Sequence, residues 1–160
     1  MKPGELLELL QEFYEDRLAL LIRHEANARE ISQYDFNNTY QYIIAREEVH
    51  LSWVRTAIEG LGGSVSVGSH VPTSFAPGQG QTAVLAADAK TADQFVARWR
   101  DRTEAIAHAR HRGMIQVILG ETLEHKRFFE LALAGRNDLL GRHADGAGSV
   151  GRVMPVRWIE

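Results

Sequence analysis

Residues 43–63 read IIAREEVHLSWVRTAIEGLGG, and this stretch decides the fold. Its apolar residues recur every three or four positions, which predicts an amphipathic helix that ends at Gly62-Gly63. Glu47 and His50 lie three residues apart on or beside the apolar face of that helix. A buried carboxylate is costly unless a positive partner meets it. The stretch therefore predicts that the carboxylate of Glu47 is buried with a positive partner, and a metal ion is one candidate for that partner.

Three further helices are expected around this one. They cover residues 3 to about 34, 91 to about 111 and 114 to about 134, with a turn at Gly113. Residues 62–90 are rich in Gly, Pro and Ser and have no helical period, and they are long for a loop inside a domain. We interpret them as a crossover between two parallel helices. Short, long and short connections predict an all-α four-helix bundle with one long crossover, and an up-down bundle with a large insertion is the alternative.

The bulk composition fits one globular domain. The chain has 160 residues, 44% hydrophobic and 24% charged, with a net charge of −3. We expect the bundle over residues 1–135 and, over residues 136–160, a tail that packs on the bundle or on a partner subunit. The absence of cysteine excludes disulfides, thiolate metal sites and cysteine nucleophiles. Mixed charge signs argue against nucleic acid, and no apolar run is long enough for a membrane. No secretory signal is recognised, so a cytoplasmic location is expected.

Two of the other helices add acidic and imidazole groups to the interior. In an antiparallel hairpin, Glu25 is expected at the depth of Glu47. On the last helix, Glu121 shares the apolar face, with Glu124 and His125 to either side. Carboxylates this close repel one another, and a divalent cation relieves the repulsion; iron, manganese or zinc suits the ligand types. The expected metal ligands are Glu25, Glu47, His50, Glu121, Glu124 and His125.

These segments resemble a known superfamily. Glu25 in HEANAREISQY, Glu47-x-x-His50 and the Glu121/His125 segment look like the ferritin-like, rubrerythrin-type di-iron carboxylate proteins. The resemblance covers residues 3–135 and implies a ferritin-like four-helix bundle that binds two iron or manganese ions and acts in oxidation-reduction with oxygen or peroxide. The resemblance assigns no catalytic residue in this chain. The chain departs from the pattern in the fourth helix, where Glu121-x-x-x-His125 replaces Glu-x-x-His and Glu124 stands where the histidine belongs.

Other interpretations stay open. The apolar stripe of the third helix includes Arg102 where a carboxylate is expected. Arg102 could neutralise the inner acids, which would give a metal-free bundle serving in oligomerisation or interaction. Glu47 and His50 would then be a satisfied polar pair in the core. A single zinc ion on His50 and His125, as in a hydrolase, is a third interpretation. The broad apolar faces of the helices favour a homodimer.

Overall fold

The computed structural model describes residues 3–65, 80–136 and 139–140. Within these residues it contains four helices and no strand, which confirms the all-α prediction. The helices are α1 (Pro3–Ala28), α2 (Tyr34–Gly60), α3 (Gln81–Glu104) and α4 (Ala109–Leu133). The first helix is shorter than expected, because the chain turns after Ala28 to enter α2.

The hairpin of α1 and α2 is closed at both ends by short local devices. At the turn, the side-chain amide of Asn37 donates to the carbonyl oxygen of Ala28 at 2.9 Å and satisfies the end of α1. At the other end, Gly62 has a φ of 80°, a conformation that glycine adopts without strain. Gly63 packs closely against Leu7 of α1, and a β-carbon at Gly63 would require the methyl end of that leucine to move. The predicted end of α2 at these two glycines is therefore confirmed.

The bounds of the second hairpin differ from the prediction. α3 begins at Gln81 rather than near Thr91, because half of the residues in AVLAADAK (83–90) are alanine, which favours helices. Its Val84 and Leu85 lie in the core. The turn falls at residues 105–108, and Gly113 lies inside α4 rather than between the helices. One glycine within a helix costs about 1 kcal/mol, which the packing of the helix outweighs.

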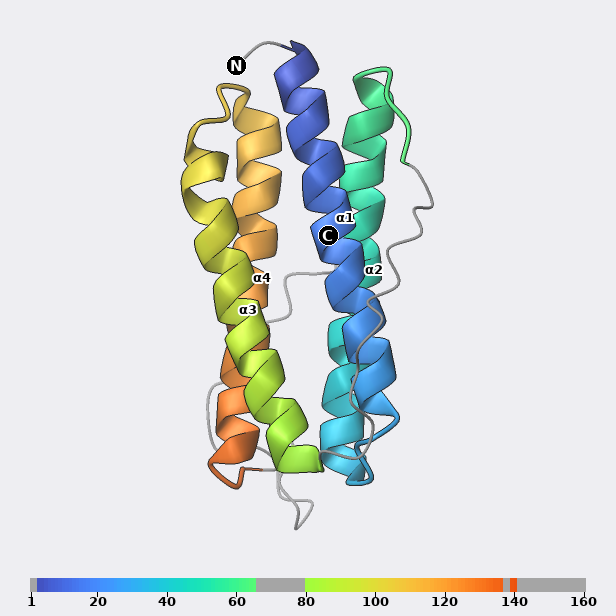
Figure 1. The fold of residues 1–160 in the computed structure, drawn as a ribbon, viewed down its shortest axis with the longest axis vertical. Coiled ribbons are helices and arrows are strands. Elements are labelled where there is room, and N and C mark those ends of the chain that lie inside the picture. Colours follow the sequence, from blue (N-terminus) through green and yellow to red (C-terminus); the bar gives the residue numbers. More distant parts are fainter. Residues whose placement is uncertain (1–2, 66–79, 137–138, 141–160) are drawn as a thin grey trace, which may run out of the picture.

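The four helices form a bundle in which sequence neighbours α2 and α3 run in the same direction (Figure 1). α1 packs closely against α2 and α3, and α4 packs closely against the same two helices, so every closely packed pair of helices is antiparallel. The chain must return along the whole bundle between α2 and α3, which makes this connection the long one. Residues 66–79 of the predicted crossover lie outside the described residues, as does the predicted tail from residue 141 onward.

The apolar core is divided into two clusters along the bundle axis. One holds Phe13, Val54, Trp99 and Ile118 among others, toward the end where α2 finishes. The other surrounds Phe129 and lies toward the opposite end, where α2 begins. In α1, α2 and α4, buried polar residues stand between the positions that feed these clusters. A polar layer therefore crosses the middle of a core that is otherwise apolar.

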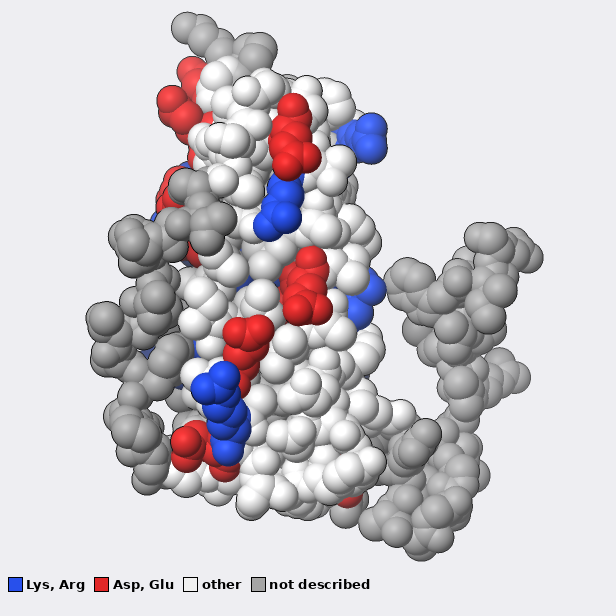
Figure 2. Space-filling model, turned by 90° about the vertical axis from the view of Figure 1, so that its right-hand side faces the viewer, with Lys and Arg blue, Asp and Glu red and all other residues white. Residues whose placement is uncertain are grey.

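The face of the bundle that α2 forms carries both signs of charge. Figure 2 shows the side of the bundle on which α2 lies in Figure 1, and on it acidic and basic side chains alternate without a large field of either sign. A continuous basic stripe, the usual footprint of nucleic-acid binding, is not seen on this face among the described residues. None of the described helices combines the length and apolarity that crossing a membrane requires.

Candidate functional site

Six buried side chains from three helices form the polar layer between the two apolar clusters. Each of them is at most 2% exposed. We call this group the Arg17 layer, and its members are Arg17 and His24 of α1, Glu47 and His50 of α2, and Thr122 and His125 of α4. Two partly exposed residues, Arg46 and Glu121, border it at the rim. α3 contributes none of these side chains.

Arg17 is at the centre of the hydrogen bonding in this layer. Its guanidinium is fully buried, donates from Nη1 to the hydroxyl of Thr122 at 2.8 Å, and donates from Nη2 to Nδ1 of His50 at 2.9 Å. Nη2 also lies 3.4 Å from Oε1 of Glu47. Burial lowers the pKa of Arg17 and the negative charge of Glu47 opposes that shift. An internal cation therefore stands among the side chains that were expected to surround a metal.

Glu47 meets a second positive partner in His24. Nδ1 of His24 lies 3.0 Å from each carboxylate oxygen of Glu47. Burial opposes the ionisation of Glu47, but the charges of His24 and Arg17 outweigh it, so the pKa of Glu47 is lowered. For His24 burial likewise opposes the charge, and the carboxylate of Glu47 wins, so the pKa of His24 is raised. Each of the two residues therefore favours the charged form of the other.

The contacts of His50 fix its tautomer. Because an arginine only donates, Nδ1 of His50 accepts from Arg17 and carries no proton. Nε2 then carries the proton and donates to Oε2 of Glu121 at 2.9 Å. Burial, followed by the charge of Arg17, lowers the pKa of His50 to about 4, in keeping with a neutral ring. Arg46 completes the rim with two hydrogen bonds of 2.9 Å to the carboxylate of Glu121.

His125 is also held neutral, since burial and then the charge of Arg17 lower its pKa to about 3. Its Nδ1, the Nε2 of His24 and the Nε of Arg17 are buried and have no hydrogen-bond partner among the described residues. A buried polar atom without a partner is costly, so such atoms are rare in folded proteins. The layer retains a capacity for hydrogen bonding or coordination that its own side chains do not use.

A second buried polar group, the Asp88 cluster, lies nearer the end of the bundle where α2 begins. The carboxylate of Asp88 accepts from Nε of Arg23 at 2.7 Å, from Nδ2 of Asn27 at 2.8 Å and from the hydroxyl of Tyr40 at 2.5 Å. Burial, and then the charge of Asp88, raise the pKa of Tyr40, so the phenol stays a donor. Both carboxylate oxygens are bonded within the protein, which is typical of a structural group.

The structure separates the six residues predicted as metal ligands. Glu47, His50 and His125 lie together in the Arg17 layer, and Glu121 touches it from the rim. Glu25 and Glu124 are exposed, so the expectation that they face the interior is wrong. At about 100° per residue Glu25 is roughly 80° from Arg17, which occupies the inner line of α1.

The expected role of Arg102 is also wrong. Its guanidinium binds the carboxylate of Glu12 at the surface and lies 4.1 Å from the ring centre of Trp99. It contacts no carboxylate of the layer, and Arg17 supplies the internal positive charge instead. Stacking on Trp99 draws the side chain along the outside of the bundle, which explains why a residue in phase with the apolar stripe still reaches water.

Sequence reasoning missed three members of the layer, Arg17, His24 and Thr122. The first two repeat at a helical spacing with the buried Leu10, Phe13 and Ala28, so the apolar periodicity of α1 could have placed them inside. In α4 the inward pair at a spacing of three is Thr122-x-x-His125. In ferritin-like metal proteins two helices each carry Glu-x-x-His. Here α2 keeps that pattern in Glu47-x-x-His50, while α4 has threonine in place of glutamate.

The residues of the layer do not fit a carboxylate-bridged pair of metal ions. Such a centre takes a glutamate from each of four helices, and the layer buries one carboxylate, Glu47. Arg17 places a positive charge against it, which would repel a metal cation. Across the residues that the structure covers, no group of three or more His, Cys, Asp or Glu side chains could hold a metal ion.

Comparison with known proteins adds one finding on the fold. By sequence, neither a protein family nor a curated protein matches the chain. By structure, the chain is similar to a protein from Bacillus anthracis str. Ames described as "ferritin like, diiron-carboxylate proteins", with a TM-score of 0.67 and 18% identity. The match covers 83% of this chain and 99% of that one. The chain therefore has the ferritin-like four-helix fold, and the resemblance seen in the sequence is confirmed for the fold.

Proposed function

We propose that this ferritin-like protein works without a dinuclear metal centre, as a helical-bundle interaction protein. The observation that carries the proposal is the fully buried guanidinium of Arg17, which contacts His50, Thr122 and Glu47. An arginine remains protonated in proteins, so it neutralises the buried glutamate permanently. A metal bound beside it would be placed against a fixed like charge. In this proposal the layer stabilises one specific packing of the helices, and the surface of the bundle binds the partner.

Metal analysis of the purified protein tests this proposal. The protein is produced in medium supplied with iron, manganese and zinc, and metal content is measured with and without chelation. We expect no stoichiometric metal in the wild type. We also expect Zn²⁺ to raise the Tm of Arg17→Ala but not of the wild type, because the substitution removes the competing charge next to Glu47, His50 and His125. The matched control is Arg98→Ala, which removes an exposed arginine.

A second candidate function is favoured by the unpartnered nitrogens of His24 and His125. In it, Arg17 swings away and Glu47, His50, Glu121 and His125 hold iron, manganese or zinc; Glu25 and Glu124 would have to turn inward to join them. Bound iron or manganese would supply oxidation-reduction with oxygen or peroxide. Stoichiometric metal in the wild type that is lost in Glu47→Ala would support this candidate and overturn the first.

We propose in addition that the chain forms a homodimer. Large exposed apolar side chains gather at the end of the bundle where α2 begins and α4 finishes, where Tyr34 is 76% and Leu133 39% exposed. Covering such side chains is a usual reason for self-association. Sedimentation equilibrium should give twice the chain mass, and Tyr34→Asp should shift the protein toward monomer. A monomeric wild type at high concentration would contradict the dimer.

A further inference from the structure

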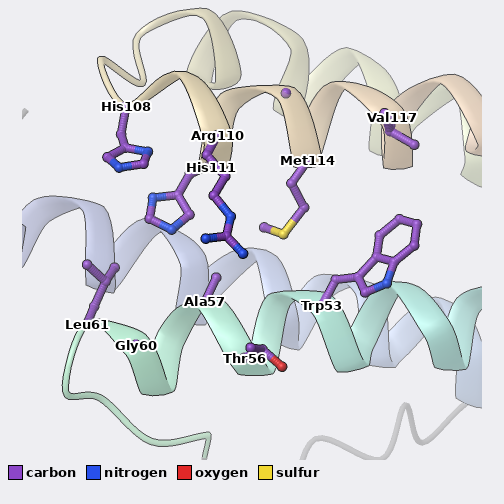
Figure 3. A pocket seen from close by; sticks show the side chains of 11 residues that line it. Trp53, Thr56, Ala57, Gly60, Leu61, His108, Arg110, His111, Met114 and Val117 are labelled. Carbon is purple, nitrogen blue, oxygen red and sulfur yellow. The ribbon is translucent and has the colours of Figure 1, made fainter.

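A groove lies between the last turns of α2 and the first turns of α4, at the opposite end from Tyr34. Its volume is about 670 Å³, within the range of 300–1,000 Å³ that small-molecule sites usually have. Figure 3 shows Arg110 and Met114 pointing from α4 toward α2, and the indole of Trp53 rising from α2 toward α4 on the side of Val117. Two separate helices thus form the opposite walls of the groove.

The two ends of the groove differ in chemistry. Arg110, His108 and His111 stand together at one end, and Trp53 and Val117 at the other, with the thioether of Met114 between them (Figure 3). Val117 is 50% and Trp53 36% exposed, so this apolar wall meets water when the groove is empty. A ligand that covered it would gain from the removal of apolar surface from water.

The other end carries the basic side chain of Arg110 beside His108 and His111. No acidic side chain lines the groove within the part of the chain that the structure describes. The amino end of α4 lies here, its N-cap residue His108 makes no capping hydrogen bond, and helix amides at such an end favour anions. Burial and the charges of His108 and Arg110 lower the pKa of His111, another sign of a positive local field. The site therefore complements a negative group.

We propose that the groove binds a monocarboxylate with a long apolar body, of the fatty-acid class. The carboxylate lies at Arg110, which can bond both of its oxygens, and the chain runs along Met114 toward Trp53 and Val117. Met114 is flexible and polarisable, so it adapts to bodies of different shape. The groove lies outside the Arg17 layer, and this inference goes beyond the proposed function and holds with or without a metal in the core.

Titration of the full chain with decanoate, followed by calorimetry below the micelle concentration, tests the inference. We expect saturable binding of one decanoate per chain. 1-Decanol, which has the same body without the charge, should bind at least about tenfold more weakly, since a hydrogen bond to a charged group contributes about 1.5–3 kcal/mol. Acetate, which has the charge without the body, should show no binding. Equal affinity for decanoate and decanol would overturn the inference.

Single substitutions at the two ends of the groove test where decanoate binds. Arg110→Gln should weaken decanoate about tenfold or more, and Val117→Asp should abolish binding by placing a negative charge at the apolar end. Arg127→Gln, an exposed arginine of the same helix outside the groove, should leave the affinity unchanged. If Arg110→Gln lowers the Tm and leaves decanoate affinity unchanged, the arginine serves only the carboxyl end of α2 and the inference fails. It also fails if the protein binds phosphatidylcholine vesicles but not free decanoate.

Discussion

The Asp88 cluster and the Arg17 layer are buried in the same bundle, but only the Asp88 cluster uses all its hydrogen bonds. Asp88 accepts from three donors, and no buried side-chain atom of its cluster lacks a partner among the described residues. The Arg17 layer leaves three buried nitrogens unpartnered. A cluster in which every buried polar atom has a hydrogen-bond partner is typical of a purely structural group. The incomplete one contains Glu47-x-x-His50, a pattern that helices of ferritin-like metal proteins carry.

The largest expected effect concerns the internal cation. Arg17→Met takes the donor from Thr122 and His50 and leaves Glu47 with His24 as its positive partner, and it should lower the free energy of unfolding by about 3 kcal/mol. The double variant Arg17→Met/Glu47→Leu should recover part of that loss, because the carboxylate leaves with the guanidinium. Urea denaturation measures both, with Arg98→Met as the control, an exposed arginine whose loss should cost less than about 1 kcal/mol. A double variant as unstable as the single one would contradict the pairing.

Acid should destabilise the fold through the two neutral histidines of the Arg17 layer. The pKa values of His50 and His125 are lowered from 6.5 to about 4 and about 3, so the unfolded chain binds protons that the folded chain refuses. Stability is therefore complete above pH 6.5 and falls as the pH drops, by about 2 kcal/mol for each histidine between pH 7 and pH 5. His24 offsets a smaller part of this loss, because its pKa is raised in the folded chain, which therefore binds more protons at His24 than the unfolded chain as the pH falls through 6.5. Denaturation at both pH values measures the loss.

Two variants check that assignment. His125→Asn should remove about half of the loss between pH 7 and pH 5, since one of the two titrating groups is gone. His108→Gln, an exposed histidine at the start of α4, should leave the loss unchanged. A pH dependence that survives both His125→Asn and His50→Asn would show that other groups control it.

The Asp88 cluster should respond more moderately. Tyr40→Phe removes the 2.5 Å hydrogen bond to the carboxylate and should cost roughly 1.5–3 kcal/mol, as for other bonds to charged groups. The pH dependence between pH 7 and pH 5 should stay as in the wild type. Tyr42→Phe, a more exposed tyrosine of the same helix, is the matched control. A loss as large as that of Arg17→Met would remove the contrast between the two clusters.

The smallest effect is expected at Arg102. Its partner Glu12 is 42% exposed, and exposed ion pairs contribute little. Arg102→Ala should cost about 1 kcal/mol, mostly through the lost contact with Trp99. A loss of several kcal/mol in thermal or urea unfolding would show that Arg102 acts on the core after all.

The helical pattern was sufficient to predict the fold and the burial of Glu47 and His50. Their position near the centre of a clean apolar stripe left only one face of α2 to go inside. The apolar face of α1 is broad, so the side of the helix that points inward was ambiguous by roughly 80°. Glu25 was therefore predicted to lie inside, where Arg17 and His24 are buried. Because of the same ambiguity in α4, Glu121 was predicted on the inner face, where the structure buries Thr122. Which arginine neutralises a buried acid depends on how helices dock, and one sequence does not contain that information.

Most contacts of the Arg17 layer and the Asp88 cluster join the α1–α2 hairpin to the α3–α4 hairpin. Arg17 reaches Thr122, Arg46 reaches Glu121, and Arg23 reaches Asp88. If one hairpin slid along the other by a single helical turn, about 5.4 Å, leucine could replace leucine but every one of these pairs would separate. The apolar surfaces thus hold the two hairpins together, and the polar bonds between them select a single alignment of the hairpins along the bundle axis.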